Sequence, residues 1–152
     1  NMLTSGDWVT PTLSGIPIFE KPPMLYWMIA VSYQVFGISD WAARLPVVLS
    51  AIVLCWLVAQ IGTWAFGTRA GALAGICLAT SAGFFLFSRV LFHDVPLTLS
   101  MTVAMWAGLR IFDDAERQPD RWALAFWAAL AIGILIKGLV AAALCAGTLV
   151  LY

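Results

Sequence analysis

The chain has 152 residues, of which 62% are hydrophobic and 11% charged, and its formal net charge is zero. Soluble domains are only about 45 to 50% apolar, so this composition predicts an integral membrane protein. The balanced charge excludes the strongly basic surface of nucleic-acid-binding proteins and the acidic tails typical of disorder. We therefore expect membrane lipids, and no nucleic acid, among its partners.

Residues 1–38 predict an extracytoplasmic first loop that ends in an interfacial helix. The first 21 residues are polar and rich in turn-forming residues, which indicates an ordered loop with at most a short helix. Pro22-Pro23 and Gly37 then frame an apolar helix over 24–36. With its prolines this helix is about 22 Å long, shorter than a bilayer core of roughly 30 Å. We expect it to lie at the membrane interface, with aromatic side chains in the headgroup region: Tyr26, Trp27 and Tyr33.

Residues 39–152 predict a membrane-spanning helical region of about five spans. Ser39-Asp40 can cap the first of them, which continues through the uncharged run 45–66 to a tight reversal at Gly67. A second span is expected over 70–87. Its glycines at 71 and 75 have the small-xxx-small spacing of closely packed membrane helices.

The rest of the chain predicts a third span and a helical hairpin. The third span begins at Pro96 and runs to about Phe112, before a charged loop at 113–121. If residues 122–152 formed one helix, it would be about 46 Å long and would hold Lys137 at mid-membrane. Because a charge at that depth is expensive, we favour two helices joined by a turn at Lys137-Gly138.

The distribution of Lys and Arg predicts which segments share a side of the membrane. Arg69, Arg110 and the loop at 113–121 give one side a modest basic excess, which the positive-inside rule makes cytoplasmic. Counting the spans then places residues 1–38, the polar break at 88–95 and the Lys137 turn on the outer side.

Six ionisable side chains are therefore expected to gather at the outer interface, beside the aromatic interfacial helix. Such a group suits an anionic headgroup on an apolar tail, because cations can hold a phosphate while carboxylates can accept a proton, bind a metal or contact sugar hydroxyls. The six are Glu20, Lys21, Arg89, His93, Asp94 and Lys137.

Each of these residues also has a structural interpretation. Glu20 and Lys21 can form a solvated pair beside the membrane, and Asp94 can equally cap the helix near Pro96. A lone His93 is weak evidence for a metal. Lys137 is the hardest to explain structurally, since its surroundings in the sequence are apolar. For three further arginines, Arg44, Arg69 and Arg110, snorkelling to lipid phosphate is the favoured reading.

Several segments together resemble a known family, the GT-C glycosyltransferases, and within it the N-terminal portion of the aminoarabinose transferases and protein O-mannosyltransferases. The segments are Met2 to Pro11 through Gly15, Phe19-Glu20-Lys21-Pro22-Pro23-Met24-Leu25-Tyr26-Trp27, Phe36-Gly37, Ala42-Ala43-Arg44-Leu45-Pro46, Asp94-Val95-Pro96 and Ile136-Lys137-Gly138.

The resemblance implies an all-α, polytopic membrane bundle that transfers a sugar from a polyprenyl-phosphate carrier to lipid A, protein or a glycan, with inversion. It implies a multi-pass protein of the bacterial inner membrane with a periplasmic active site, and the interfacial helix would help to shape the groove for the carrier lipid. Lys21 and Lys137 would stabilise the departing phosphate, while Asp94 and Glu20 would contact the sugar or the acceptor. A divalent metal held by these carboxylates is an open alternative, and no other cofactor is expected. We assign Asp94 and Glu20 as catalytic; the substrate-binding residues are Lys21, Lys137, Arg89, His93 and Tyr26.

The chain departs from the family pattern in two places. The main catalytic aspartate of the family usually lies shortly before the position of Asn1, and Leu139 stands where a proline usually follows the Lys-Gly turn. The family's C-terminal spans and outer domain are also missing. We therefore interpret the chain as the N-terminal catalytic half of a longer enzyme, inactive alone.

Two other classes of function stay open at this stage. A transporter or lipid flippase would use its charged residues to line a path through the bilayer, whereas here they cluster at the ends of spans. A non-catalytic membrane partner would keep the fold and lack the upstream aspartate.

Overall fold

A computed structural model describes residues 12–13, 16–17, 22–89, 93–113 and 118–151. Helices dominate it. A pair of two-residue strands precedes them, β1 (Thr12–Leu13) and β2 (Ile16–Pro17), which pair antiparallel. The helices are α2 (Met24–Phe36), α3 (Asp40–Phe66), α4 (Thr68–Thr80), α5 (Ala82–Arg89), α6 (Asp94–Ile111), α7 (Pro119–Lys137) and α8 (Val140–Leu151).

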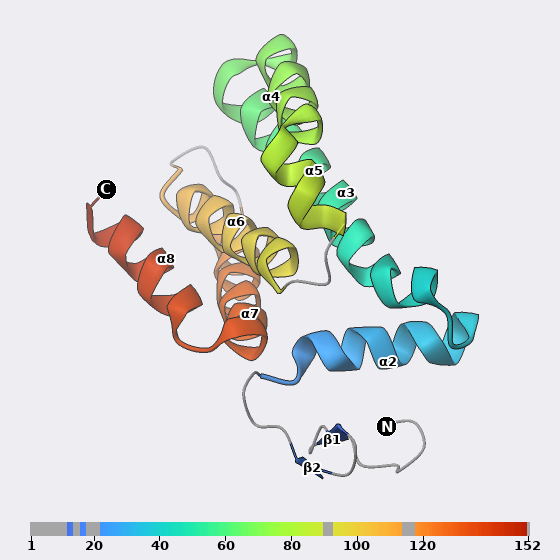
Figure 1. Ribbon diagram of the computed structural model, residues 1–152. Helices are drawn as coiled ribbons and strands as arrows, with labels where there is room; N and C mark the ends of the chain where they lie inside the picture. Colours follow the sequence, from blue (N-terminus) through green and yellow to red (C-terminus); the bar gives the residue numbers. More distant parts are fainter. Residues whose placement is uncertain (1–11, 14–15, 18–21, 90–92, 114–117, 152) are drawn as a thin grey trace.

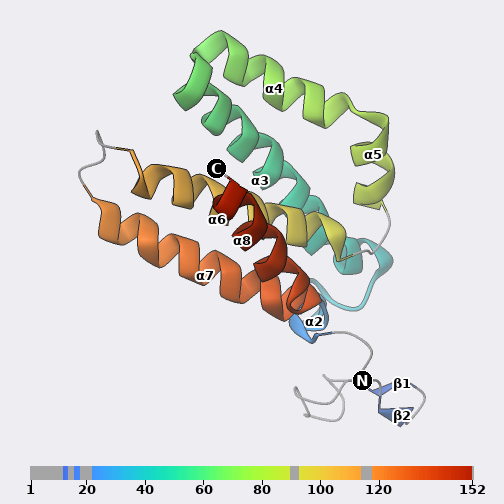
Figure 2. The same ribbon diagram turned by 90° about the vertical axis from the view of Figure 1, so that its left-hand side faces the viewer.

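The helices form a membrane-type bundle with α2 lying across one end of it. Figures 1 and 2 show α2 at the end nearest β1 and β2, while α3, α6, α7 and α8 run away from it. The most extensive contacts are those of α6 with α7 and of α3 with α4, and α6 also packs on α3. The all-α prediction is confirmed, and the strand pair is an addition that the sequence did not indicate.

Most of the predicted helix boundaries are confirmed. α2 covers the predicted residues 24–36, and Gly37 ends it with φ +80°. Gly67 ends α3 with φ +89° and Gly138 ends α7 with φ +75°. Positive φ is readily adopted only by glycine, which is why these positions end helices. The hairpin turn predicted at Lys137-Gly138 is therefore present, with Leu139 in place of the family's proline.

The segment 70–87, predicted as one span, is not one continuous helix, and whether it crosses the membrane stays a prediction. The structure divides this segment at Ser81, whose extended backbone, with ψ 133°, separates α4 from α5. Side-chain hydroxyls bond the carbonyls of the last turn of α4, since Thr80 donates to Cys77 at 3.4 Å and Ser81 to Leu78 at 3.0 Å. A hydropathy average does not register such a break, because one residue changes it little.

Two helices of the described residues are long and apolar enough to cross a membrane, α3 with 27 residues and α7 with 19. α6 has the predicted place and 18 residues. The division of the chain at residue 38 and the total of about five spans stay predictions.

A hydrogen bond between α2 and α3 compensates for a proline inside α3. Pro46 has no N–H, so the carbonyl of Ala42, four residues earlier, loses its helical partner. The hydroxyl of Ser32 on α2 donates to this carbonyl at 2.6 Å, and Ser32 is only 5% exposed. This hydrogen bond thus joins α2 to α3 at the position where α3 lacks a hydrogen bond of its own.

We expect Ser32→Ala to lower the stability of the full-length protein by about 1–3 kcal/mol, because it leaves a buried carbonyl unsatisfied. Thermal unfolding of the protein in detergent micelles measures the change. Ser50→Ala is the matched control: Ser50 is equally buried, but its hydroxyl bonds the carbonyl of Pro46 within its own helix, where a ladder bond remains. In a Pro46→Ala background the cost of Ser32→Ala should largely disappear. An undiminished cost there would contradict the explanation.

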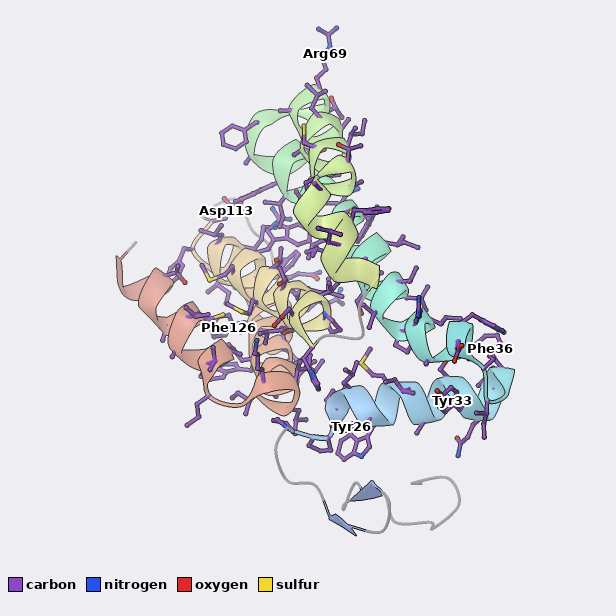
Figure 3. All side chains as sticks on the ribbon, viewed as in Figure 1. Tyr26, Tyr33, Phe36, Arg69, Asp113 and Phe126 are labelled. Atoms are coloured by element: carbon purple, nitrogen blue, oxygen red, sulfur yellow. The ribbon has the colours of Figure 1, made fainter. Side chains whose placement is uncertain are left out.

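The end of the bundle away from α2 is held by an arginine between tryptophans. Arg110, in the last turn of α6, lies over the ring of Trp64 at 5.5 Å and over that of Trp122 at 5.0 Å, and it pairs with Asp113 at 3.5 Å. Its contacts thus join α3, α6 and α7, whereas the sequence favoured a snorkelling side chain. Figure 3 shows Arg69 and Asp113 on the opposite side of the molecule from Tyr26 and Tyr33. This arrangement agrees with the predicted grouping of the charged loops, whose membrane side stays a prediction.

Candidate active site

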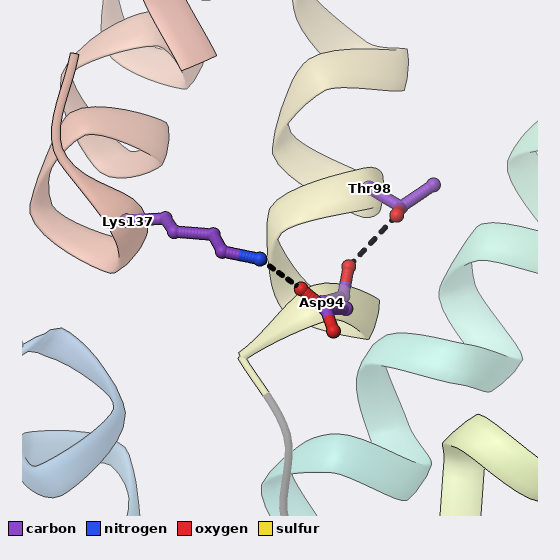
Figure 4. A network of polar contacts seen from close by, with 3 residues as sticks. All are labelled: Asp94, Thr98 and Lys137. Carbon is purple, nitrogen blue, oxygen red and sulfur yellow. Dashed lines mark hydrogen bonds and ion pairs between the residues drawn. The ribbon is translucent and has the colours of Figure 1, made fainter. Parts of the chain in front are cut away.

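An ion pair between the start of α6 and the end of α7 forms the centre of the candidate site. Lys137 Nζ donates to Asp94 Oδ1 at 2.5 Å across 43 residues of sequence (Figure 4). The two side chains are 48% and 41% exposed, so a ligand can reach both. An ion pair this accessible contributes only about 0.2–1 kcal/mol to stability, which is too little to explain a lysine in so apolar a sequence.

The two helix ends stabilise the charges of Asp94 and Lys137 electrostatically. Asp94 is the first residue of α6 and Lys137 the last of α7, and the two helices pack side by side. The amino end of a helix stabilises an anion and its carboxyl end a cation. Each side chain is therefore favoured by its own helix before the two meet.

Close packing brings the two helix ends together. A Cβ on Gly133 of α7 would lie 2.9 Å from the Cβ of Ala141 and 3.1 Å from the hydroxyl of Ser100, so only glycine allows α6, α7 and α8 to approach this closely. Beside the ion pair, Ile136 and Leu97 share a buried cluster with Ala141. Lys137 thus contacts α6, while its position at the outer interface stays a prediction.

The interpretation of Asp94 as a helix cap is not supported. His93 occupies the N-cap position, Asp94 lies one residue inside the helix, and its carboxylate bonds Lys137. The hydroxyl of Thr98 donates to the backbone carbonyl of Asp94 at 2.7 Å (Figure 4). Sequence reasoning selected Asp94 and Lys137 separately, and Thr98 was missed because a threonine in an apolar helix has no distinguishing pattern.

A largely apolar groove, lined in part by Asp94, has a volume of about 500 Å³. It runs between α3, the break at Ser81 and α6, and Asp94 adds a charged side chain to its apolar lining. Its hydroxyl groups come from Ser81, Thr98 and Thr102. This combination of a polar head and an apolar wall suits an amphipathic ligand.

Of the other predicted site residues, two lie near the pair. His93 is buried, with 9% exposure, and Tyr26 of α2 meets it edge-on with the ring centroids 6.3 Å apart. Arg89 is the last residue of α5, and its side chain lies outside the described part of the chain. Glu20 and Lys21 also lie outside the described residues.

No metal centre is apparent in residues 22–89, 93–113 and 118–151, since no three His, Cys, Asp or Glu side chains there lie close enough to hold an ion. The Asp94 carboxylate is engaged by the cation of Lys137. Glu20, the other carboxylate predicted to hold a divalent metal, lies outside the described residues, so a metal at this site stays a prediction.

Solved structures with the same fold give the context for this site. The chain superposes on a crystal structure of ArnT from Cupriavidus metallidurans in the apo state with a TM-score of 0.94 and 33% identity, over 99% of this chain and 28% of that one. The corresponding structure bound to undecaprenyl phosphate gives 0.93 and 35%, with the same coverage.

Sequence comparisons agree with the fold. Undecaprenyl phosphate-alpha-4-amino-4-deoxy-L-arabinose arabinosyl transferase 1 from Proteus mirabilis (strain HI4320) is 33% identical over 94% of this chain and 26% of its own length. The chain thus spans about a quarter of that relative. The family model described as dolichyl-phosphate-mannose-protein mannosyltransferase matches residues 20–152. The resemblance to the GT-C glycosyltransferases is confirmed, and the chain belongs to the dolichyl-phosphate-mannose-protein mannosyltransferase family.

Proposed function

We propose that the protein containing this chain is a membrane glycosyltransferase that moves a sugar from a polyprenyl-phosphate carrier to a lipid, protein or glycan acceptor. The observation that carries the proposal is the agreement of nearly the whole chain with ArnT, including a form bound to undecaprenyl phosphate. The accessible Asp94–Lys137 pair beside an apolar groove supports it, because a polyprenyl phosphate has the same division into a charged head and an apolar tail.

The proposed reaction exchanges one bond at the anomeric carbon for another. The acceptor oxygen attacks this carbon, the bond to the carrier phosphate breaks, and the phosphate leaves with the electron pair. The proton of the acceptor passes to a carboxylate. Negative charge therefore grows on the phosphate, and cations fixed close to it lower the barrier. Attack opposite the leaving group gives inversion.

Residue roles follow from this chemistry. Lys137 and Lys21 face the phosphate, and Asp94 and Glu20 contact the sugar and acceptor hydroxyls. Arg89 adds a further cation from the end of α5. We place this site at the outer, periplasmic face of a bacterial inner membrane, because the basic residues Arg69 and Arg110 favour the other side as cytoplasmic.

A transporter or flippase is the second candidate, and the positions of the charges disfavour it. Asp94 and Lys137 lie at helix ends, and Arg110 lies in the last turn of α6. A pathway through the bilayer would place ionisable groups near the middle of the spans. A non-catalytic partner would show neither transport nor transfer.

Chemical conversion of the carrier separates these functions. We expect the purified full-length protein, in vesicles with a polyprenyl-phosphate sugar and a cell-envelope extract as acceptor, to release free polyprenyl phosphate that mass spectrometry detects. A transporter would move the lipid and leave its glycosidic bond intact. Deletion of the intact gene should, in turn, cause the sugar-loaded carrier to accumulate in cells. Absence of both effects would exclude the proposed function.

A further inference from the structure

The first turn of α2 contacts the residues on both sides of Asp94. Tyr26 meets the ring of His93, immediately before the carboxylate, at an interplanar angle of 74°. Leu25, which is 3% exposed, belongs to the same buried cluster as Val95, immediately after it. Met24 also packs on the cluster that contains Leu97, so the first turn of α2 borders the start of α6 at three alternate positions, 93, 95 and 97.

Asp94 itself takes no part in these contacts. Its carboxylate is directed to Lys137 on α7, and its carbonyl accepts the Thr98 hydroxyl (Figure 4). The backbone at Asp94 is therefore located by the buried neighbours at 93 and 95, while its charged group stays open to a ligand. Pairs of rings in the edge-to-face arrangement have a preferred geometry, which makes the Tyr26–His93 contact directional.

α2 is itself fixed at two points along its length. Leu25 in its first turn shares a buried cluster with Val95 of α6, and one turn before its end Ser32 bonds the carbonyl of Ala42 on α3. Motion of α2 relative to the bundle would therefore be transmitted to the start of α6.

We propose that Tyr26 and His93 are positioning residues that act through Asp94: their ring contact couples the interfacial helix α2 to the Asp94–Lys137 pair. This assignment rests on the proposed function for its kinetic test, and it replaces direct substrate binding by these two side chains. The burial of His93 supports it, because a ring that is 9% exposed has little surface to offer a ligand.

The kinetic test compares ring-preserving with ring-deleting variants of the full-length protein. We expect Tyr26→Leu to lower kcat by about 10-fold with a nearly unchanged KM for the carrier, because small displacements of a catalytic group are costly. Tyr26→Phe and His93→Phe keep a ring at the contact and should keep most of the activity. Tyr33→Leu is the matched control, a half-buried tyrosine further along the same helix (Figure 3).

Loss of activity in Tyr26→Phe as large as in Tyr26→Leu would overturn the proposal, because it would make the phenolic hydroxyl the important group. A rise in KM with unchanged kcat would also overturn it, since it would indicate substrate binding. An unchanged kcat in Tyr26→Leu would also overturn the proposal.

A second measurement does not depend on sugar transfer. Cysteines are placed at positions 94 and 137 in a full-length protein whose native cysteines are replaced by alanine, and a short thiol-specific bifunctional reagent joins them in membranes. Tyr26→Leu should slow this cross-linking several-fold, and Tyr26→Phe should not. An equal rate in the two backgrounds would refute the coupling. If the wild-type protein transfers no sugar, the proposed function fails, while the cross-linking result still decides the role of Tyr26.

Discussion

Lys137→Met in the full-length protein is expected to lower kcat for sugar transfer by about 100-fold or more, the usual effect of removing one preorganised group that stabilises developing negative charge. Methionine keeps most of the length and apolar character of the lysine stem, and the accessible ion pair contributes little to folding. The protein should therefore still insert and unfold near the wild-type temperature. Turnover of a polyprenyl-phosphate sugar, followed by mass spectrometry, measures the loss.

Asp94→Asn is expected to reduce turnover by a similar factor, because the amide cannot accept a proton or attract Lys137 as an ion. The control is Arg69→Ala, which removes an exposed cation on the opposite side of the molecule. We expect it to leave turnover unchanged.

The exchanged double variant, Asp94→Lys with Lys137→Asp, separates a structural from a chemical role. It restores an ion pair but reverses the charges at the two helix ends, and we expect it to remain inactive. Full activity in this variant would mean that the pair only holds α6 against α7. Wild-type turnover in Lys137→Met would show that the charge of Lys137 takes no part in sugar transfer.

Gly71→Ala is expected to destabilise the protein by about 2 kcal/mol through overpacking, although alanine is the better helix former. A Cβ at this position would lie 2.5 Å from the backbone nitrogen of Thr63 and even closer to its hydroxyl and to the carbonyl of Ala59. Backbone atoms cannot turn aside as a flexible side chain can, so α4 must move away from α3. Thermal unfolding in detergent micelles measures the change.

Gly83→Ala is the control, because it makes the same substitution in α5 where a Cβ would meet nothing within 4 Å. There the helix propensity acts alone and should stabilise by up to about 1 kcal/mol. The two variants should therefore shift the unfolding temperature in opposite directions. A shift of the same sign and size in both would show that the close approach of α3 and α4 is not what requires glycine.

The helix ends were predictable because they depend on local backbone chemistry. Prolines before α2, and glycines at 37, 67 and 138 with positive φ, mark boundaries that the structure places where the sequence indicated. The turn at Gly138 also brought Lys137 to a helix end, as the cost of a mid-membrane charge required. The small-xxx-small spacing at Gly71 and Gly75 correctly indicated close packing, in this case on α3.

The break at Ser81 was missed because its cause is equally local but leaves no mark on hydropathy. Hydroxyls of Thr80 and Ser81 bond the carbonyls of Cys77 and Leu78 in the last turn of α4 and so satisfy groups that a helix end would expose. Such hydroxyls also occur inside continuous membrane helices, as Thr63 does in α3. The residue type alone therefore does not decide between a break and a continuous helix.

The sequence by itself determined the class of the molecule, the places where most helices start and stop, and which charged residues stand at helix ends. The tertiary structure alone decided their partners: Lys137 for Asp94, His93 for Tyr26, and the Ala42 carbonyl for Ser32. The reason is geometrical. Helices that are apolar on nearly every face carry no stripe from which their rotation can be read, so which side chains meet depends on how closely the helices approach and at what angle they cross.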